Sequence, residues 1–192
     1  MKYRLYKITR PIIRFLMKLI YRIEIINSEN IPDTGCVLAG NHKNNLDCVL
    51  LMSSTKRIIR FLGKVELFDK HSWLFRNMGV IPVNRKTKNK KAIIEAEKVL
   101  NNNGIIGIFP EGTFNNTEYV VRPFKMGAVK FSYDTKKPIV PFAIINDYKI
   151  FRKSVKLIFG NAYYVKNNDL VYENNRLMNK VIKLMKEDYE KK

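Results

Sequence analysis

The sequence predicts an α/β fold, in which one domain is built on a largely parallel sheet with helices on both faces. The chain has 192 residues, about the length of one domain. Its 46% hydrophobic content is enough for a buried core. Apolar runs of strand length alternate with longer segments of helical periodicity, as they do in parallel sheets. We find no internal repeat and no Pro-, Gly- or Ser-rich linker, which also favours a single domain.

Residues 1–22 are predicted to form a basic amphipathic helix. They contain seven basic side chains, and the first acid is Glu24. From Lys7 the basic residues recur every three or four positions, so on a helix they form a cationic stripe beside an apolar face. The basic residues are Lys2, Arg4, Lys7, Arg10, Arg14, Lys18 and Arg22. The apolar residues are Ile8, Ile12, Ile13, Phe15, Leu16, Leu19, Ile20 and Ile23.

Two interpretations of this helix differ in what its apolar face contacts. A helix with aliphatic residues on one face and only cations on the other is typical of a membrane interface. The alternative is an ordinary amphipathic helix that packs on the domain. We favour an interfacial membrane-binding helix at 1–22, with the main domain at 23–192. Arg14 and Lys18 interrupt the apolar run, so the helix is not expected to span a bilayer or to be a signal peptide.

After this helix, strands and helices are expected to alternate. The expected strands are 22–26, 37–41, 58–63, 80–83, 105–109, 139–144 and 155–159. The expected helices are 46–54, 88–102, 125–133 and 170–190. In such sheets, ligands bind beyond the carboxyl ends of the strands. Functional side chains should therefore gather where these strands end.

The net charge of +19, from 36 basic and 17 acidic residues, indicates an anionic partner. Nucleic acid, an anionic membrane and phosphorylated substrates all qualify. The sequence lacks zinc-finger spacing, a heptad repeat behind the basic stretch and a ribonucleoprotein motif, so a nucleic-acid-binding module is disfavoured. The two cysteines, Cys36 and Cys48, are expected to be reduced and cannot form a four-ligand zinc site alone. We expect no metal and no cofactor.

His42 and Asp47 follow the predicted strand 37–41. Five residues along a continuous helix correspond to a rotation of about 500°, which would turn the two side chains apart. They can meet only if His42 lies on a loop and the helix begins near Asn44 or Asn45, both plausible N-caps. Asp47 could then accept a hydrogen bond from Nδ1 and make Nε2 a better general base. A structural His–Asp pair is the alternative.

Two further groups lie at strand ends. Glu111, Gly112 and Thr113 follow the predicted strand 105–109, where the carboxylate could orient a hydroxyl or hold the loop in place. A simple Pro-Gly turn is the alternative. Lys64 and Arg85 each follow a predicted strand and are suited to a phosphate.

Together and in this order, these segments resemble the glycerolipid acyltransferase family, whose type members are 1-acylglycerol-3-phosphate acyltransferases. The shared blocks are His-x4-Asp at 42–47, a strand-terminal Arg at 85, Phe-Pro-Glu-Gly-Thr at 109–113 and Val-Pro at 140–141. Segments 64–68 and 123–128 are also similar. The resemblance covers residues 23–146, about two thirds of the chain. It implies that His42 and Asp47 are catalytic and that 23–192 is an acyltransferase domain.

One position departs from the family pattern. Family members usually have an Arg after Glu-Gly-Thr that contacts the acceptor phosphate, whereas this chain has Phe114 and Asn115. Phosphate recognition is therefore not carried over to that position. Lys64 and Arg85 become the main candidates for this role, with Arg122 and Lys125 as possible substitutes.

The resemblance implies acyl transfer from acyl-ACP or acyl-CoA to the free hydroxyl of a lysophospholipid, most simply 1-acyl-sn-glycerol-3-phosphate. His42 would act as general base and Asp47 would orient it. Backbone N–H groups near Gly112 and at the start of the helix after His42 are expected to stabilise the oxyanion. Glycerol-3-phosphate or another lysophospholipid is the alternative acceptor. We expect a cytoplasmic protein bound peripherally to the anionic inner face of the cell membrane.

Overall fold

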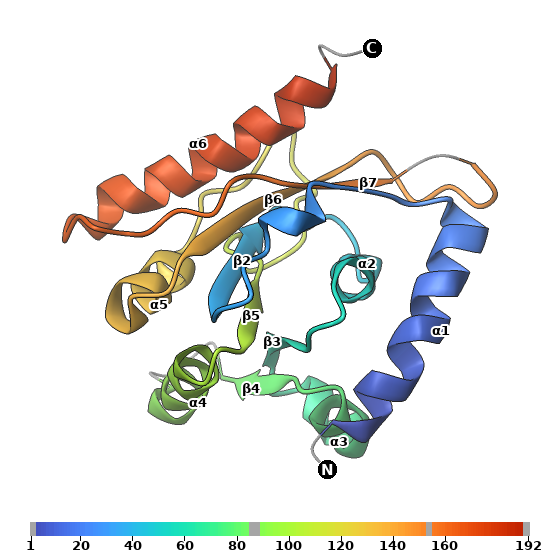
Figure 1. Ribbon diagram of the computed structural model, residues 1–192, viewed down its shortest axis with the longest axis horizontal. Helices are drawn as coiled ribbons and strands as arrows, with labels where there is room; N and C mark the ends of the chain where they lie inside the picture. The colour runs from blue at the N-terminus through green and yellow to red at the C-terminus, as the bar shows by residue number, and fades with distance from the viewer. Residues whose placement is uncertain (1–2, 85–88, 153–154, 190–192) are drawn as a thin grey trace.

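The computed structural model describes residues 3–84, 89–152 and 155–189 (Figure 1). Within them lies a seven-stranded sheet with the order β1-β7-β6-β2-β5-β3-β4. All neighbouring strands are parallel except β6 and β7, which are antiparallel. The predicted α/β class and the largely parallel sheet are confirmed.

The element bounds follow the chain. The strands are β1 (Glu24–Ile26), β2 (Cys36–Gly40), β3 (Ile59–Lys64), β4 (Ile81–Val83), β5 (Ile105–Ile108), β6 (Ile139–Ile145) and β7 (Lys156–Phe159). The helices are α1 (Arg4–Tyr21), α2 (Leu46–Ser54), α3 (Leu67–Asn77), α4 (Lys90–Asn101), α5 (Gly127–Thr135) and α6 (Leu170–Tyr189), with a 3-10 turn at Ser28–Asn30.

The predicted strands lie within two residues of the observed ones, but the sequence did not predict α3. This helix contains a kink at His71, where the backbone leaves helical angles (φ −133°, ψ 37°). In the sequence, four polar residues at 69–72 interrupt the apolar ones, so no continuous periodic run marks this helix. The predicted helix 125–133 lies two residues before the observed α5, Gly127–Thr135. The expected start of α4 at residue 88 lies outside the described residues.

Helices cover both faces of the sheet (Figure 1). On one face, α4, α5 and α6 bury side chains such as Leu100, Val129 and Leu177. On the other face, α1 and α2 bury side chains such as Tyr6 and Leu50. The central strands β2 and β6 are buried along their whole length. This arrangement holds the carboxyl ends of the parallel strands rigidly at one edge.

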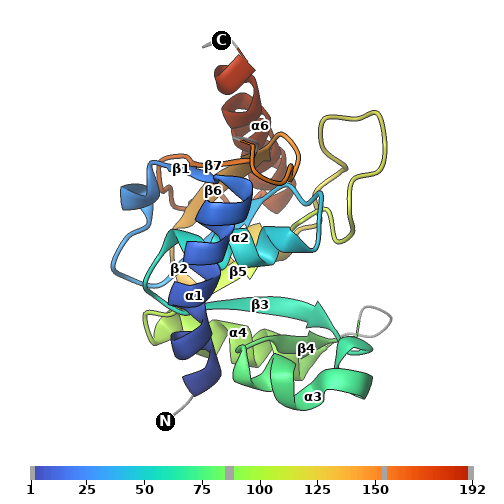
Figure 2. The ribbon, with the colours of Figure 1, turned by 90° about the vertical axis from the view of Figure 1, so that its right-hand side faces the viewer.

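Helix α1 lies along the domain beside α2 and α3 (Figure 2). Its inner side is part of the core: Tyr6 is 1% exposed, and its hydroxyl accepts a hydrogen bond from the Ile59 N–H at 3.1 Å. Arg10 also faces inward and donates to the Thr55 carbonyl at 2.9 Å. The packing interpretation therefore describes the inner side of α1.

The outer side of α1 is apolar and exposed. Along the described part of the chain, no helix is both long enough and apolar enough to cross a membrane. The exposed apolar residues of α1 are Ile8, Ile12, Phe15, Leu16 and Leu19.

Candidate active site

The end of β2 fixes the backbone just before His42. The side chain of Asn41 bridges to the neighbouring strand β6, donating to the Ile144 carbonyl at 2.9 Å and accepting from the Ile144 N–H at 2.7 Å. At Gly40, a Cβ atom would lie 2.2 Å from the Phe142 carbonyl oxygen, so only glycine permits this approach of the strands. The loop that carries His42 therefore starts from a rigid point.

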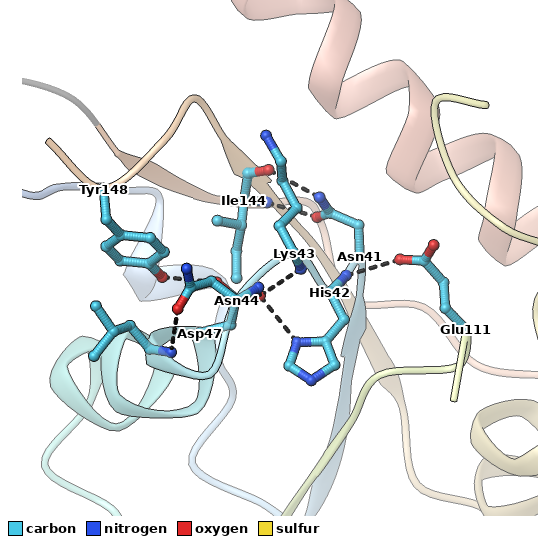
Figure 3. A network of polar contacts seen from close by, with 9 residues as sticks. Asn41, His42, Lys43, Asn44, Asp47, Glu111, Ile144 and Tyr148 are labelled. Atoms are coloured by element: carbon cyan, nitrogen blue, oxygen red, sulfur yellow. Dashed lines mark hydrogen bonds and ion pairs between the residues drawn. The ribbon is translucent and has the colours of Figure 1, made fainter. Parts of the chain in front are cut away.

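His42 and Asp47 form the predicted contact (Figure 3). His42 lies on a loop, α2 begins at Leu46, and His42 Nδ1 lies 2.9 Å from Asp47 Oδ2. An ionised carboxylate only accepts hydrogen bonds, so Nδ1 carries the proton and Nε2 of the neutral ring is left with a free lone pair. That nitrogen can accept a proton from a substrate hydroxyl.

Asp47 is fully buried and is held by three further hydrogen bonds. Its Oδ2 accepts from the N–H groups of Lys43, at 2.6 Å, and Asn44, at 2.8 Å. Its Oδ1 accepts from the Tyr148 hydroxyl at 2.7 Å. These donors compensate the carboxylate for its loss of water and fix its orientation.

Tyr148 was not predicted from the sequence. It follows β6, whose carboxyl end lies at the same edge of the sheet as that of β2. Burial raises the pKa of the Tyr148 hydroxyl, and the nearby Asp47 charge raises it further, so the phenol stays a donor. Only the rule that functional groups gather at this edge could have pointed to it.

Two aromatic rings enclose the imidazole of His42. Phe109 stacks on it, with ring centroids 3.9 Å apart and an angle of 17° between the planes. Phe114 meets it at 4.5 Å and 61°. The N–H of Asn115 donates to the His42 carbonyl at 2.9 Å. The residue that stands where relatives usually have an Arg therefore packs against the histidine.

Glu111 is 3% exposed and joins two loops (Figure 3). Its Oε1 accepts from the His42 N–H at 2.8 Å, and its Oε2 accepts from the Arg122 N–H at 2.7 Å. Burial raises the pKa of Glu111, and these two N–H groups oppose the rise. Of the two roles expected from the sequence, the geometry shows that of holding the loop in place.

A cavity of about 1160 Å³ lies beside His42. Its apolar lining comes from α1, α2, β3, α3 and α4, including Ile13, Met52, Phe61, Leu74 and Ile93. Its polar lining includes four of the predicted binding residues, Lys64, Gly112, Thr113 and Lys125. The structure thus joins an apolar space to cationic side chains at the catalytic edge.

Gly112 lets Lys125 approach the turn closely. Its backbone has a left-handed φ of 72°, and a Cβ there would lie 2.9 Å from Lys125 Nζ. Arg122 is not part of the cavity lining, and Arg85 lies outside the described residues.

Several of the backbone N–H groups expected near an oxyanion donate to acceptors within the protein, and oxyanion stabilisation at this place stays a prediction. The Gly112 N–H donates to the Phe109 carbonyl at 3.0 Å, and the Leu46 N–H to Asn44 Oδ1 at 3.0 Å. The N–H groups of residues 42–44 are held by the two buried carboxylates described above. These hydrogen bonds hold the loop that carries His42 in place.

The cysteines do not have the character of nucleophiles. Burial raises the pKa of both Cys36 and Cys48 to about 12, so each stays a thiol at neutral pH. Cys48 also lines the cavity. Across the described segments, no three His, Cys, Asp or Glu side chains gather as a metal site.

Comparisons with known proteins were made for sequence and for structure. A family profile described as "Acyltransferase" matches residues 22–145. A 1-acyl-sn-glycerol-3-phosphate acyltransferase of Bacillus subtilis is 30% identical over 169 residues, which are 83% of this chain and 83% of the relative. A probable 1-acyl-sn-glycerol-3-phosphate acyltransferase of Mycoplasma pneumoniae is 30% identical over 152 residues, 74% of this chain and only 56% of the relative. The chain thus spans little more than half of that relative.

The fold also matches a solved structure. The crystal structure of the 1-acyl-sn-glycerophosphate (LPA) acyltransferase PlsC from Thermotoga maritima superposes with a TM-score of 0.72 and 20% identity. The match covers 93% of this chain and 76% of the other.

Proposed function

Because this chain belongs to the acyltransferase family, we propose that it transfers a fatty acyl group to 1-acyl-sn-glycerol-3-phosphate and so makes phosphatidic acid. The observation that carries the proposal is the contact of His42 with the buried Asp47, with atoms 2.9 Å apart, beside a cavity that is apolar and also lined by Lys64 and Lys125. A histidine base suits a hydroxyl acceptor, an apolar cavity suits an acyl chain, and the ammonium groups suit a phosphate.

The proposed reaction uses His42 as the proton carrier. Nε2 removes the proton from the acceptor hydroxyl as its oxygen attacks the thioester carbonyl carbon of acyl-ACP or acyl-CoA. Asp47 stabilises the imidazolium that forms. The tetrahedral intermediate then collapses, the C–S bond breaks, and the departing thiolate takes the proton from Nε2. The thiols of Cys36 and Cys48 take no part in this scheme, which has no acyl-enzyme.

The acceptor phosphate is proposed to contact Lys64 and Lys125. Both residues line the cavity, and the ammonium group of Lys125 lies close to Gly112. Arg85, which lies outside the described residues, is proposed from its place in the sequence to assist them. Glu111 and Thr113 support this site, Glu111 by holding His42 in place and Thr113 from the cavity wall.

Helix α1 is proposed to hold the protein at the anionic inner face of the cell membrane. Its exposed apolar residues face away from the domain, and the exposed Lys7 and Lys18 lie beside them. Each cation near an anionic surface contributes about 1 kcal/mol to binding. The long-range attraction of the +19 charge extends to an acidic acyl carrier protein and weakens with salt.

A second acceptor is favoured by one observation. Phe114, in place of the usual Arg, packs against His42 and adds no charge to the site. An acceptor whose headgroup carries less negative charge, such as a lysophospholipid with a phosphodiester, is therefore the second candidate. Glycerol-3-phosphate carries the same phosphomonoester as the first candidate, so this observation does not favour it.

A matrix of acceptors and donors tests the proposal with purified wild type and His42→Ala. We expect phosphatidic acid from 1-acyl-sn-glycerol-3-phosphate with at least one of the two thioester donors, and loss of transfer in the folded variant. Transfer above about a tenth of wild type in folded His42→Ala would contradict the general-base role. A faster reaction with a different acceptor would favour the second candidate.

A further inference from the structure

The connection between β6 and β7 carries an apolar tip. Ile150 and Phe151 are adjacent, and they are 61% and 64% exposed. Lys149 and Arg152 flank them and are also exposed. An exposed aliphatic–aromatic pair between two cations has the composition of a segment that enters a membrane interface.

This tip is attached to the end of α1. The Phe151 N–H donates to the Ile20 carbonyl at 2.6 Å. Phe151 also has a left-handed φ of 56°, which is uncommon for an aromatic residue. In the same connection, Tyr148 meets Tyr21 edge to face with ring centroids 5.5 Å apart. The tip is therefore held beside the carboxyl end of α1, where Figure 2 shows the connection.

The outer side of α1 and this tip form one surface. At about 100° per residue, Ile8, Ile12, Phe15 and Leu19 lie within an arc of about 60° and form an exposed stripe along the helix. The tip adds two exposed apolar side chains where that stripe ends.

We propose that Ile150 and Phe151 insert into the same anionic lipid bilayer as α1 and form a second contact with it. This inference rests on the membrane association proposed above and deepens it. Cations from both segments accompany the apolar surface, and their charge favours an anionic bilayer as the partner of this surface. A second copy of this chain would bring the same cations and the same +19 charge to the interface, which opposes self-association.

The second contact would orient the catalytic edge toward the lipid. Tyr148 lies two residues before Ile150 and donates to Asp47. The segment that enters the bilayer is therefore continuous with the one that holds the catalytic carboxylate, and its insertion places His42 at a fixed height above the surface from which the acceptor is taken.

Fluorescence quenching tests the contact directly. The chain has one Trp, Trp73, so Trp73→Phe provides a dark background. Three variants are made in this Trp73→Phe background. Phe151→Trp is the probe, Phe15→Trp on α1 is the positive control, and Tyr172→Trp is the negative control. Tyr172 is 56% exposed on α6, which begins at the opposite end of the molecule from α1 (Figure 1). The vesicles are phosphatidylglycerol with brominated acyl chains.

We expect strong quenching of the tryptophans at positions 15 and 151 and none at 172. Quenching at 15 without quenching at 151 would overturn the loop contact and leave the membrane role of α1 intact. If neither is quenched, both proposals are wrong. If the protein without lipid sediments as a dimer and position 151 is buried in that dimer, the partner of this surface is a second copy of the chain instead.

A paired substitution measures the contribution of the tip. Because the area taken from water by two apolar side chains is large, Ile150→Ser with Phe151→Ser should weaken binding to anionic vesicles at least about tenfold in flotation. The matched control replaces Val171 and Tyr172 on α6 with Ser. Turnover of a short-chain, monomeric acceptor should stay unchanged in both variants. Equal vesicle binding by the two variants would refute the contact.

Discussion

On one side of His42, four hydrogen bonds hold the fully buried carboxylate of Asp47, whereas on the other side the exposed residues Lys64 and Lys125 line the cavity. The first side has one geometry, fixed by donors from the loop and from Tyr148. The second side relies on charge, which acts at longer range and tolerates movement. In the proposed reaction, proton transfer would need a precise position, while phosphate recognition would need only positive charge.

If this contrast is correct, substitutions on the buried side lower kcat, and substitutions on the exposed side raise KM. The largest effect is expected for Asp47→Asn. An asparagine can donate to Nδ1 and so favours the wrong tautomer of His42, which in a comparable triad costs about 10⁴-fold in rate. We expect kcat at saturating acceptor to fall by about 10³-fold or more, with KM little changed. Asp33→Asn, an exposed residue before β2, is the matched control and should keep full activity.

Glu111→Gln tests the second buried carboxylate. A glutamine side chain has only one acceptor oxygen. Its NH₂ group would therefore face one of the two backbone N–H groups from which Glu111 now accepts a hydrogen bond. Loss of a charge-assisted hydrogen bond costs about 2 kcal/mol, so we expect about a thirtyfold fall in kcat and a lower midpoint in urea. Glu118→Gln, at an exposed site in the same loop, is the control. An unchanged kcat with lowered stability would mean that Glu111 serves the fold alone.

Tyr148→Phe removes one of the four donors to Asp47 and leaves the ring in place. The remaining three donors keep the carboxylate bound, so the expected fall in kcat is about tenfold. Tyr164→Phe, which alters an exposed tyrosine, should have no effect. A change in KM without a change in kcat would place Tyr148 outside the proton-transfer geometry.

The smallest effects are expected on the exposed side. Lys64→Gln and Lys125→Gln should each raise KM for 1-acyl-sn-glycerol-3-phosphate about fivefold, because exposed charge pairs contribute up to about 1 kcal/mol. Their kcat should stay near wild type, and an acceptor without a phosphate should show no change. Lys166→Gln, an exposed residue outside the cavity lining, is the control. A hundredfold fall in kcat for either variant would contradict the expectation that the exposed side affects KM alone.

Sequence patterns predicted the features that depend only on residues close to one another in the chain. The strand bounds followed from apolar runs, and the His42–Asp47 contact followed from the turn of a helix and the position of its cap. The pairing of β6 with β7 in the opposite direction could not be predicted, because the direction of β7 is set by a connection without periodicity.

The remaining site residues depend on tertiary contacts. Tyr148 reaches Asp47 only because β2 and β6 are neighbours in the sheet. The engagement of the Gly112 and Leu46 N–H groups is likewise visible only once the loops are folded. Phe114 could be noted in the sequence as a departure, but its packing on His42 follows from the three-dimensional path of its loop.

The place of β1 in the sheet has a consequence for synthesis of the chain. In the described sheet β1 pairs with β7 alone, and Glu24 lies opposite Lys156, so most of the chain separates the two. Contacts between such distant segments form slowly and late. While a ribosome makes the protein, β1 waits for its partner β7 until 132 further residues have followed. Helix α1, whose partners α2, α3 and Ile59 come soon after it, can pack long before β1 is locked in place.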